Sequence, residues 1–360
     1  MGFSAGLALF AALTAAVAPP EAPPRPSPSP AASMGSVFPV GLEEVHISLS
    51  VSDARGKPVT ALNANDFEVT EDGRPQTIQL FARGVDEGQD SAAAREALAL
   101  DLGLLLDTSS SMLNELKLSQ EAASRFLEAI PRARELYTIF FDENIRVSRY
   151  DSENQQGLFD RIHAATGGGN TALYDAIAVY LSRVQDGSGR KVLVLFTDGE
   201  DTQSALSFSD VLKLVRSGRV TIYSIAFGMY GGVPSRTLRP RAVLEQLASM
   251  TGGRVFTPRN SRDLAGIYDR ILEDLAAQFV VGYVSDNPAR DGRFRKIKVT
   301  VKVPGLTVRH RTGYTPREDE VSEAPAHPLD FARDIGPIVI TRIKAADEQA
   351  LIRQFLSQPD

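Results

Sequence analysis

The chain of 360 residues contains no cysteine and no tryptophan, and only four histidines. Without cysteine it can form no disulfide, no cysteine-ligated zinc site and no thiolate nucleophile. Its formal net charge of −6 argues against a general nucleic-acid binder, because such proteins usually present a basic face. No polybasic run lies beside an apolar segment, so the sequence gives no sign of binding to anionic lipid.

The histidines fall where none is an obvious general base for a serine nucleophile. His46 and His310 lie on predicted β-strands, and His327 lies in the tail. His163 is predicted on the surface of a helix. The glycine-rich segment 167–171 lacks a lysine before its threonine, which makes it a poor phosphate-binding loop. The chain is therefore predicted not to be an enzyme.

The first 37 residues are predicted to direct export and then to act as a spacer. Residues 6–18 form an apolar stretch of signal-peptide length that ends in Ala-Val-Ala, a small-residue cleavage site. We predict a signal peptide over 1–18 and an exported protein, either periplasmic, at the cell surface or secreted. The alternative is an uncleaved anchor, the only membrane contact predicted. Residues 19–37 read as a Pro/Ser-rich linker.

Segments 38–83 and 279–314 alternate polar and apolar residues, as half-buried strands do. Together they supply about seven strands, the number that a β-sandwich needs. We therefore predict one sandwich built from both flanks. Residues 315–360 are predicted to be a C-terminal tail with a short helix over 347–358.

The intervening segment 97–278 alternates strands with helices, which is typical of a mostly parallel, doubly wound sheet covered on both faces. An α/β domain inserted in a β-sandwich is thus the predicted fold class. Helices are expected over 113–130, 172–184, 208–217, 242–250 and 262–278. Strands are expected over 98–106, 137–141, 145–150, 191–196, 221–227 and 254–257.

Three polar segments of this α/β region carry oxygen-bearing side chains. They are Asp-Thr-Ser-Ser-Ser at 107–111 after one buried strand, Gly-Gly-Gly-Asn-Thr at 167–171 before a helix, and Asp198 after a second buried strand. The carboxyl ends of parallel strands meet in the crevice where open α/β sheets bind ligands. Carboxylates and hydroxyls suit Mg²⁺. The alternative, that 107–111 only caps the next helix, does not explain Thr171 and Asp198.

These three segments, in this order, resemble the metal-ion-dependent adhesion site of the von Willebrand factor type A domain family. The resemblance covers residues 98–278, and the flanks resemble those of related bacterial exported proteins. It implies a metal site in which Ser109, Ser111 and Thr171 touch the ion, while Asp107 and Asp198 hold it directly or through water. Mg²⁺ is the implied metal, with Mn²⁺ or Ca²⁺ as alternatives.

Neutral hydroxyls in such a site leave a divalent ion attractive to an anionic ligand from outside the chain. We therefore predict an adhesion-type, metal-dependent module that binds a protein partner presenting Asp or Glu, with no role for nucleic acid. The alternative is an assembly or scaffold subunit of a larger complex that uses the same metal site. The sequence makes no prediction of oligomeric state.

Overall fold

The computed structural model describes residues 44–84, 91–130, 133–150, 156–184, 189–228, 234–289, 291–316 and 338–341. The predicted signal peptide, the predicted linker and the predicted helix over 347–358 lie outside these residues. Among the helices described, none is long and apolar enough to cross a membrane.

The centre of the α/β region is a seven-stranded sheet in the order β10-β9-β8-β5-β6-β7-β15. Strands β10, β9, β8, β5 and β6 run parallel, whereas β7 and β15 are joined by antiparallel pairing. The strands are β5 (Leu100–Asp107), β6 (Glu135–Phe141), β7 (Asn144–Tyr150), β8 (Arg190–Thr197), β9 (Val220–Ala226), β10 (Val255–Phe256) and β15 (Ile338–Thr341). The carboxyl ends of β5, β6 and β8 therefore lie at one edge, where the candidate site is expected.

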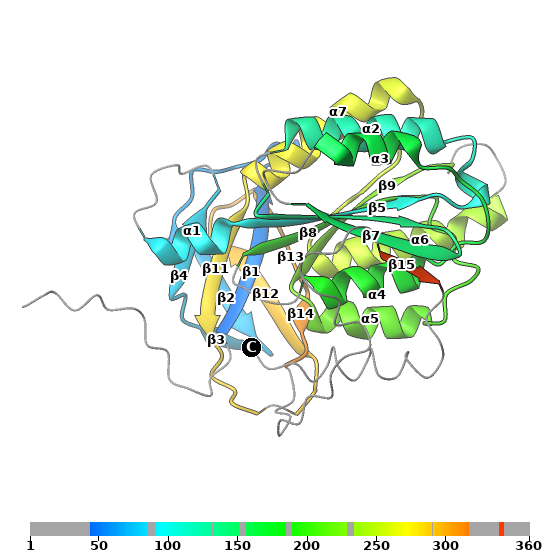
Figure 1. The fold of residues 1–360 in the computed structure, drawn as a ribbon. Coiled ribbons are helices and arrows are strands. Elements are labelled where there is room, and N and C mark those ends of the chain that lie inside the picture. The colour runs from blue at the N-terminus through cyan, green and yellow to red at the C-terminus, as the bar shows by residue number, and fades with distance from the viewer. Residues whose placement is uncertain are drawn as a thin grey trace, which may run out of the picture. The chain divides into compact units, whose positions relative to one another are not determined.

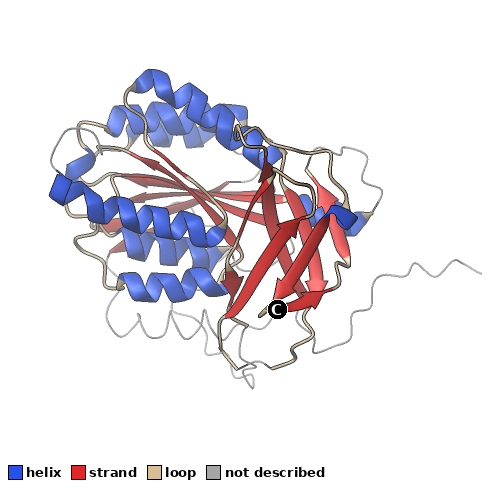
Figure 2. Cartoon of the chain, turned by 180° about the vertical axis from the view of Figure 1, so that it is seen from behind, coloured by secondary structure: helices blue, strands red, loops and turns tan. Residues whose placement is uncertain are grey.

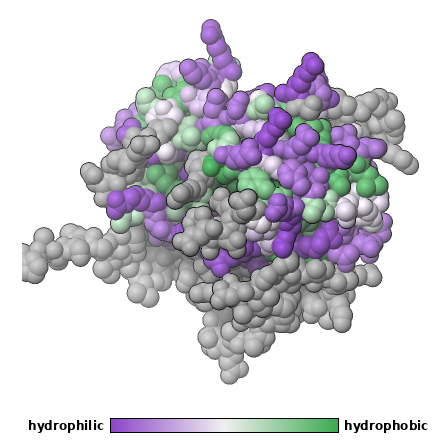
Figure 3. Space-filling view, turned by 45° about the horizontal axis from the view of Figure 1, so that its top comes forward, coloured by the Kyte–Doolittle hydropathy of each residue, from purple (hydrophilic) through white to green (hydrophobic). Residues whose placement is uncertain are grey.

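Helices cover both faces of this sheet, with α2, α3 and α7 on one side and α4, α5 and α6 on the other (Figures 1 and 2). Their bounds are α2 (Leu116–Ala129), α3 (Gln156–Ala164), α4 (Leu173–Arg183), α5 (Phe208–Ser217), α6 (Pro234–Thr251) and α7 (Ser261–Ala276). Because both faces are covered, strands β5 and β9 are buried along their whole length. The surface on the side of α2, α3 and α7 is mainly hydrophilic, with scattered apolar side chains (Figure 3).

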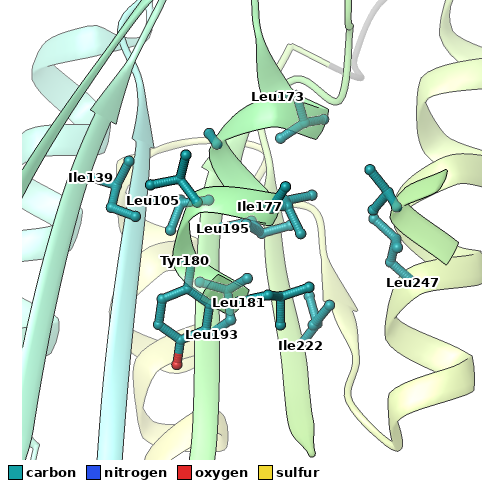
Figure 4. Packing of buried hydrophobic residues seen from close by; sticks show 14 of the residues in the cluster. Leu105, Ile139, Leu173, Ile177, Tyr180, Leu181, Leu193, Leu195, Ile222 and Leu247 are labelled. Atoms are coloured by element: carbon teal, nitrogen blue, oxygen red, sulfur yellow. The ribbon is translucent and has the colours of Figure 1, made fainter. Parts of the chain in front are cut away.

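One glycine lets a helix approach the sheet closely. A Cβ atom at Gly103 of β5 would lie 2.2 Å from the ring of Tyr180. That ring packs among apolar side chains of the sheet and α4 (Figure 4), and its hydroxyl donates to the carbonyl oxygen of Val192 at 3.0 Å. A side chain at position 103 would push α4 outward, and with it Thr171, which stands just before the helix.

The two flanks build a β-sandwich of two four-stranded antiparallel sheets, ordered β13-β1-β11-β4 and β14-β12-β2-β3. The strands are β1 (Glu44–Ser52), β2 (Phe67–Glu71), β3 (Arg74–Gln76), β4 (Leu80–Arg83), β11 (Phe279–Val284), β12 (Arg295–Val301), β13 (Thr307–His310) and β14 (Gly313–Tyr314). Each sheet combines strands from both flanks, since β1 pairs with β11 and β13 and β2 pairs with β12. The predicted fold class is confirmed.

Several local expectations need correction. Helix α2 begins at Leu116, not at residue 113, because Ser110–Met112 first form a 3₁₀ turn and the amide of Glu115 donates to the carbonyl of Met112. Helix α6 begins earlier than predicted, at Pro234. Helix α1 (Ala92–Leu98), which packs on β4, was not predicted, nor was strand β15 in the tail.

The basic side chains of β12 lie on both its buried and its exposed face. Lys296 and Lys298 are exposed, as alternation predicts. Arg295 is buried, and its guanidinium lies 3.4 Å from the carboxylate of Glu71. It also donates to the carbonyl oxygen of Asn287. Arg295 thus fixes the loop before β12 to the sandwich core.

The shared sandwich gives a prediction for fragments. A chain of residues 34–97 contains β1 to β4 but lacks β11 and β12, which supply their central partners. Of these four strands only β2 and β3 would still pair with each other, and an isolated two-stranded hairpin is marginally stable at best in water. We expect this fragment to show no cooperative thermal transition by circular dichroism. A cooperative melt of the fragment alone would contradict the shared sandwich.

Candidate metal-binding site

The first loop of the site follows β5 directly. Asp107 ends the strand and is fully buried, and Ser109 is 1% exposed. The backbone amide of Ser109 donates to Oδ1 of Asp107 at 2.9 Å. The hydroxyl oxygens of Ser109 and Ser111 lie 3.1 Å apart. The Asp-x-Ser-x-Ser segment therefore folds so that its three oxygen-bearing side chains form one connected cluster.

The second loop follows β8, which pairs with β5 so that Phe196 lies opposite Leu106. This register brings the hydroxyl of Thr197 to Oδ2 of Asp107, to which it donates at 2.6 Å. Asp198 comes next, half-buried, and its Oδ1 accepts from the amide of Glu200 at 3.0 Å. Gly199 has a φ of +81°, a left-handed conformation that favours glycine.

The third loop is the glycine-rich segment, which lies against the first. The amide of Gly168 donates to the carbonyl of Thr108 at 2.8 Å, and the amide of Ser110 donates to the carbonyl of Gly169 at 3.0 Å. Thr171, which is 3% exposed, has its amide bonded to the hydroxyl of Thr202 at 3.0 Å. Thr202 belongs to the loop after β8, so all three loops are joined by direct bonds.

Electrostatics single out Asp107. The pKa of its carboxyl is raised from 3.8 to about 7, mainly by burial and to a smaller extent by the charge of Asp198. Hydrogen bonds from Ser109 and Thr197 act in the opposite direction. No lysine or arginine of the described residues forms an ion pair with Asp107. A buried carboxylate without a positive partner is costly, and a bound cation would remove that cost.

The donor set fits a hard divalent cation. It offers two carboxylates and three hydroxyls, all oxygen, as Mg²⁺ prefers. Within the part of the chain that the structure describes, no group of three or more His, Asp or Glu side chains is placed to hold a metal ion. The predicted set differs from such groups because three of its five side chains are hydroxyls.

Sequence reasoning missed residues that position these loops. Asp142 follows β6, the strand next to β5, and its Oδ2 accepts from the hydroxyl of Thr108 at 3.0 Å and from the guanidinium of Arg146 at 2.6 Å. Its carbonyl accepts from the amide of Ala172 at 2.9 Å. Asp142 thus ties the first loop to the third. A polar residue at the end of a neighbouring strand was the available signal.

Two further acidic residues, Asp201 in the second loop and Asp175 on α4, accept hydrogen bonds between this loop and the helix. Burial raises the pKa of the Asp201 carboxyl, whose Oδ1 accepts from the amide of Tyr174 at 3.2 Å and the hydroxyl of Ser204 at 2.5 Å. Asp175 of α4 accepts from the amides of Ala205 and Leu206. These bonds attach the second loop to α4.

Asp142 gives the next prediction. Asp142→Ala leaves the guanidinium of Arg146 and the hydroxyl of Thr108 without their shared acceptor, so the first loop loses one of its bonds to the end of β6. We expect Mg²⁺ affinity to fall by about tenfold or more, as for other residues that orient metal ligands, with the fold retained. Calorimetric titration measures this, with Asp160→Ala, an exposed position on α3, as the control. Equal affinities for both variants would refute the positioning role.

The fold and the oxygen-rich loops define an α/β domain with a cluster of oxygen-bearing side chains at the carboxyl edge of its sheet. Residues 101–270 match the von Willebrand factor type A domain family, so the chain carries a domain of that family. Domains of this family are generally protein-interaction modules rather than enzymes.

Solved structures with a similar fold come from several organisms. Proximal thread matrix protein 1 from the mussel byssus is 19% identical over 50% of this chain, with a TM-score of 0.40, and this chain covers 48% of its length. A von Willebrand factor type A protein from Catenulispora acidiphila is 11% identical, covering 77% of this chain and 76% of its own, with a TM-score of 0.42. The pilus adhesin SpaC from Lactobacillus rhamnosus GG is 8% identical, covering 74% and 51%, with a TM-score of 0.42. No curated protein matches the chain.

Proposed function

We propose that this protein is a divalent-metal-dependent protein-binding module. The metal is Mg²⁺, or alternatively Mn²⁺ or Ca²⁺. Its ligands from the chain are Asp107, Ser109, Ser111, Thr171 and Asp198, directly or through water. The observation that carries the proposal is the fully buried Asp107 carboxylate, which has hydroxyls and a second carboxylate near it and no ion-paired lysine or arginine among the described residues.

The same donor set explains why the partner is acidic. Mg²⁺ takes about six oxygens, and the chain offers five side chains, three of them neutral. At least one position is left for an oxygen from outside. A carboxylate is the strongest oxygen ligand that a protein partner can present, because its charge adds to the coordination. The partner therefore supplies Asp or Glu.

Asp198 provides the direct test. Asp198→Asn removes one of two carboxylates but keeps the size of the side chain, so Mg²⁺ affinity by calorimetric titration should fall by at least about tenfold. Asp269→Asn, an exposed aspartate on α7, is the matched control and should bind Mg²⁺ like the natural chain. Equal Mg²⁺ affinity in Asp198→Asn, or no Mg²⁺ binding by the natural chain, would refute the proposal.

The proposed place of action is the cell envelope or beyond, which rests on the apolar residues 6–18. Fractionation of the source cells tests this together with the role. Recovery outside the cytoplasm supports an adhesive role, whereas recovery inside it would favour the assembly or scaffold role with the same metal site.

A further inference from the structure

An exposed leucine lies beside the first loop of the candidate site. Leu113 follows Ser111 by two positions and is 52% exposed, the largest value among the large apolar side chains that the structure describes. Ser111 itself is exposed. A single exposed leucine is ordinary on a protein surface. Its position next to a candidate metal ligand is what makes it a candidate for contact with a partner.

An exposed glutamate lies beside the third loop. Glu143 stands in the turn between β6 and β7 and is exposed. Among the described residues it forms no hydrogen bond or ion pair. It follows Asp142, whose carbonyl accepts from the amide of Ala172, the residue after Thr171. An acidic side chain near the candidate site is therefore available to a positive charge from outside the chain.

The glycine-rich segment lies between these two side chains. A Cβ atom at Gly167 would lie 2.9 Å from Cδ2 of Leu113, and one at Gly169 would lie 3.1 Å from Cδ of Glu143. A Cβ atom at Gly168, between them, would meet no atom within 4 Å beyond its chain neighbours. The leucine and the glutamate thus contact the two ends of one stretch of backbone, and the space over its middle is open.

The backbone sets an upper limit on the separation of the two side chains. Two peptide units join Gly167 to Gly169, so Cδ2 of Leu113 and Cδ of Glu143 are at most about 17 Å apart. An extended peptide covers that span with about five residues. The candidate ligands Ser111 and Thr171 lie in the same two loops as these contacts. One short segment of a partner can therefore reach the metal and both flanking side chains.

We propose that the site selects a protein segment in which an apolar residue and a basic residue flank the acidic metal ligand within about five positions. This inference rests on the proposed function, because it names the residues that accompany the acidic one. The apolar residue packs on Leu113, and the lysine or arginine pairs with Glu143. The chain carries a net charge of −6, so a basic residue also offsets the repulsion that a purely acidic segment meets.

A random heptapeptide library displayed on phage tests the proposal on the full chain. Peptides are bound in Mg²⁺ and eluted with EDTA. On the natural chain we expect enrichment of Asp or Glu with a large apolar residue on one side and Lys or Arg on the other. Enrichment of acidic peptides with no preference at the neighbouring positions would overturn the inference.

Two variants assign the preferences to their residues. Selection on Leu113→Ser should lose the apolar preference, and selection on Glu143→Lys should lose the basic one. The controls are Val303→Ser, which removes a 38% exposed valine of the sandwich, and Asp269→Lys, which reverses an exposed charge on α7. Both should select the same peptides as the natural chain. An unchanged preference on Leu113→Ser or on Glu143→Lys would overturn the role of that residue.

Affinities of one synthetic peptide, the most enriched sequence, give the magnitude. Fluorescence anisotropy in Mg²⁺ should show binding about tenfold weaker to Leu113→Ser and to Glu143→Gln than to the natural chain. A calorimetric titration with Mg²⁺ alone separates the partner from the ion. Metal affinity that falls tenfold in Glu143→Gln would show that Glu143 serves the ion, and would overturn its assignment to the partner.

The outcomes separate the two proposals. If the library yields no peptide whose binding requires Mg²⁺, the metal-dependent function fails and the selection proposal fails with it. If Mg²⁺-dependent acidic peptides are enriched and bind equally to the natural chain, Leu113→Ser and Glu143→Gln, only the selection proposal fails.

Discussion

In the absence of metal, Asp107→Asn should unfold at higher denaturant concentration than the natural protein at pH 8. The reason is that Asp107 is fully buried and pairs with no cation of the described residues. Asparagine keeps an acceptor for the amide of Ser109 and removes the buried charge. A residue at the centre of the proposed site is thus expected to reduce the stability of the metal-free fold.

The sign of the pH dependence follows from the direction of the shift. Burial raises the pKa of Asp107 from 3.8 to about 7, so the folded state holds this proton more tightly than the unfolded state. The stability contributed by the protonated form is complete below pH 3.8 and is lost as the pH rises through 7. At one pKa unit per 1.4 kcal/mol, the loss is about 4 kcal/mol at pH 8.

Urea unfolding in EDTA at pH 5 and pH 8 measures this effect. The difference in unfolding free energy between Asp107→Asn and the natural protein should increase from pH 5 to pH 8. Asp269→Asn should have the unfolding free energy of the natural protein at both pH values. With Mg²⁺ in excess, the natural protein should gain stability by mass action and Asp107→Asn should not. A natural protein that is more stable than Asp107→Asn in EDTA at pH 8 would contradict the argument.

The sequence predicts most of this fold because its strands and helices have unlike patterns. The short apolar run of β5 predicts a buried strand, and the alternation of polar and apolar residues in β12 predicts a half-buried strand. Helix α2 was predicted three residues too early, since hydrophobic spacing does not show that Ser110–Met112 close a 3₁₀ turn. Strand β15 is only four residues long. It depends on pairing with β7, a partner almost two hundred positions away, so no local pattern predicts it.

The residues of the candidate site also fall into two groups: those that local sequence indicates and those that depend on the tertiary fold. Asp107, Ser109, Ser111, Thr171 and Asp198 stand in segments whose composition is conspicuous, and the structure joins their loops by direct bonds. Whether they bind metal stays a prediction. Thr197 and Asp142 stand at the ends of strands, but sequence alone does not assign their roles, because their bonds to the first loop depend on which strands flank β5. Strand order is a tertiary property, set by packing.

The largest loss of stability is expected at the junction between the sandwich and the α/β region. Asp274, near the end of α7, is 6% exposed. Its Oδ1 accepts from the guanidinium of Arg309 on β13 at 2.5 Å, and its Oδ2 accepts from the hydroxyl of Tyr223 on β9 at 2.6 Å. Arg309 also donates to the carbonyl of Gly252 at 3.0 Å. One carboxylate therefore joins the last helix to a strand of each region.

Asp274→Ala should destabilise the protein by about 3 to 5 kcal/mol, because it leaves a largely buried guanidinium and a buried hydroxyl without their acceptor. The comparison with Asp274→Leu/Arg309→Met identifies the cause. If the unpaired charge is responsible, the double variant should recover most of the loss, since replacing both members of a buried pair is often neutral.

Urea unfolding of both variants, with Asp269→Ala as an exposed control on the same helix, measures these differences. The control should lie within about 0.5 kcal/mol of the natural protein. Near-natural stability of Asp274→Ala would show that the junction does not depend on this carboxylate. A double variant as unstable as Asp274→Ala would show that the pair itself, and not the charge left behind, holds α7 to the sandwich.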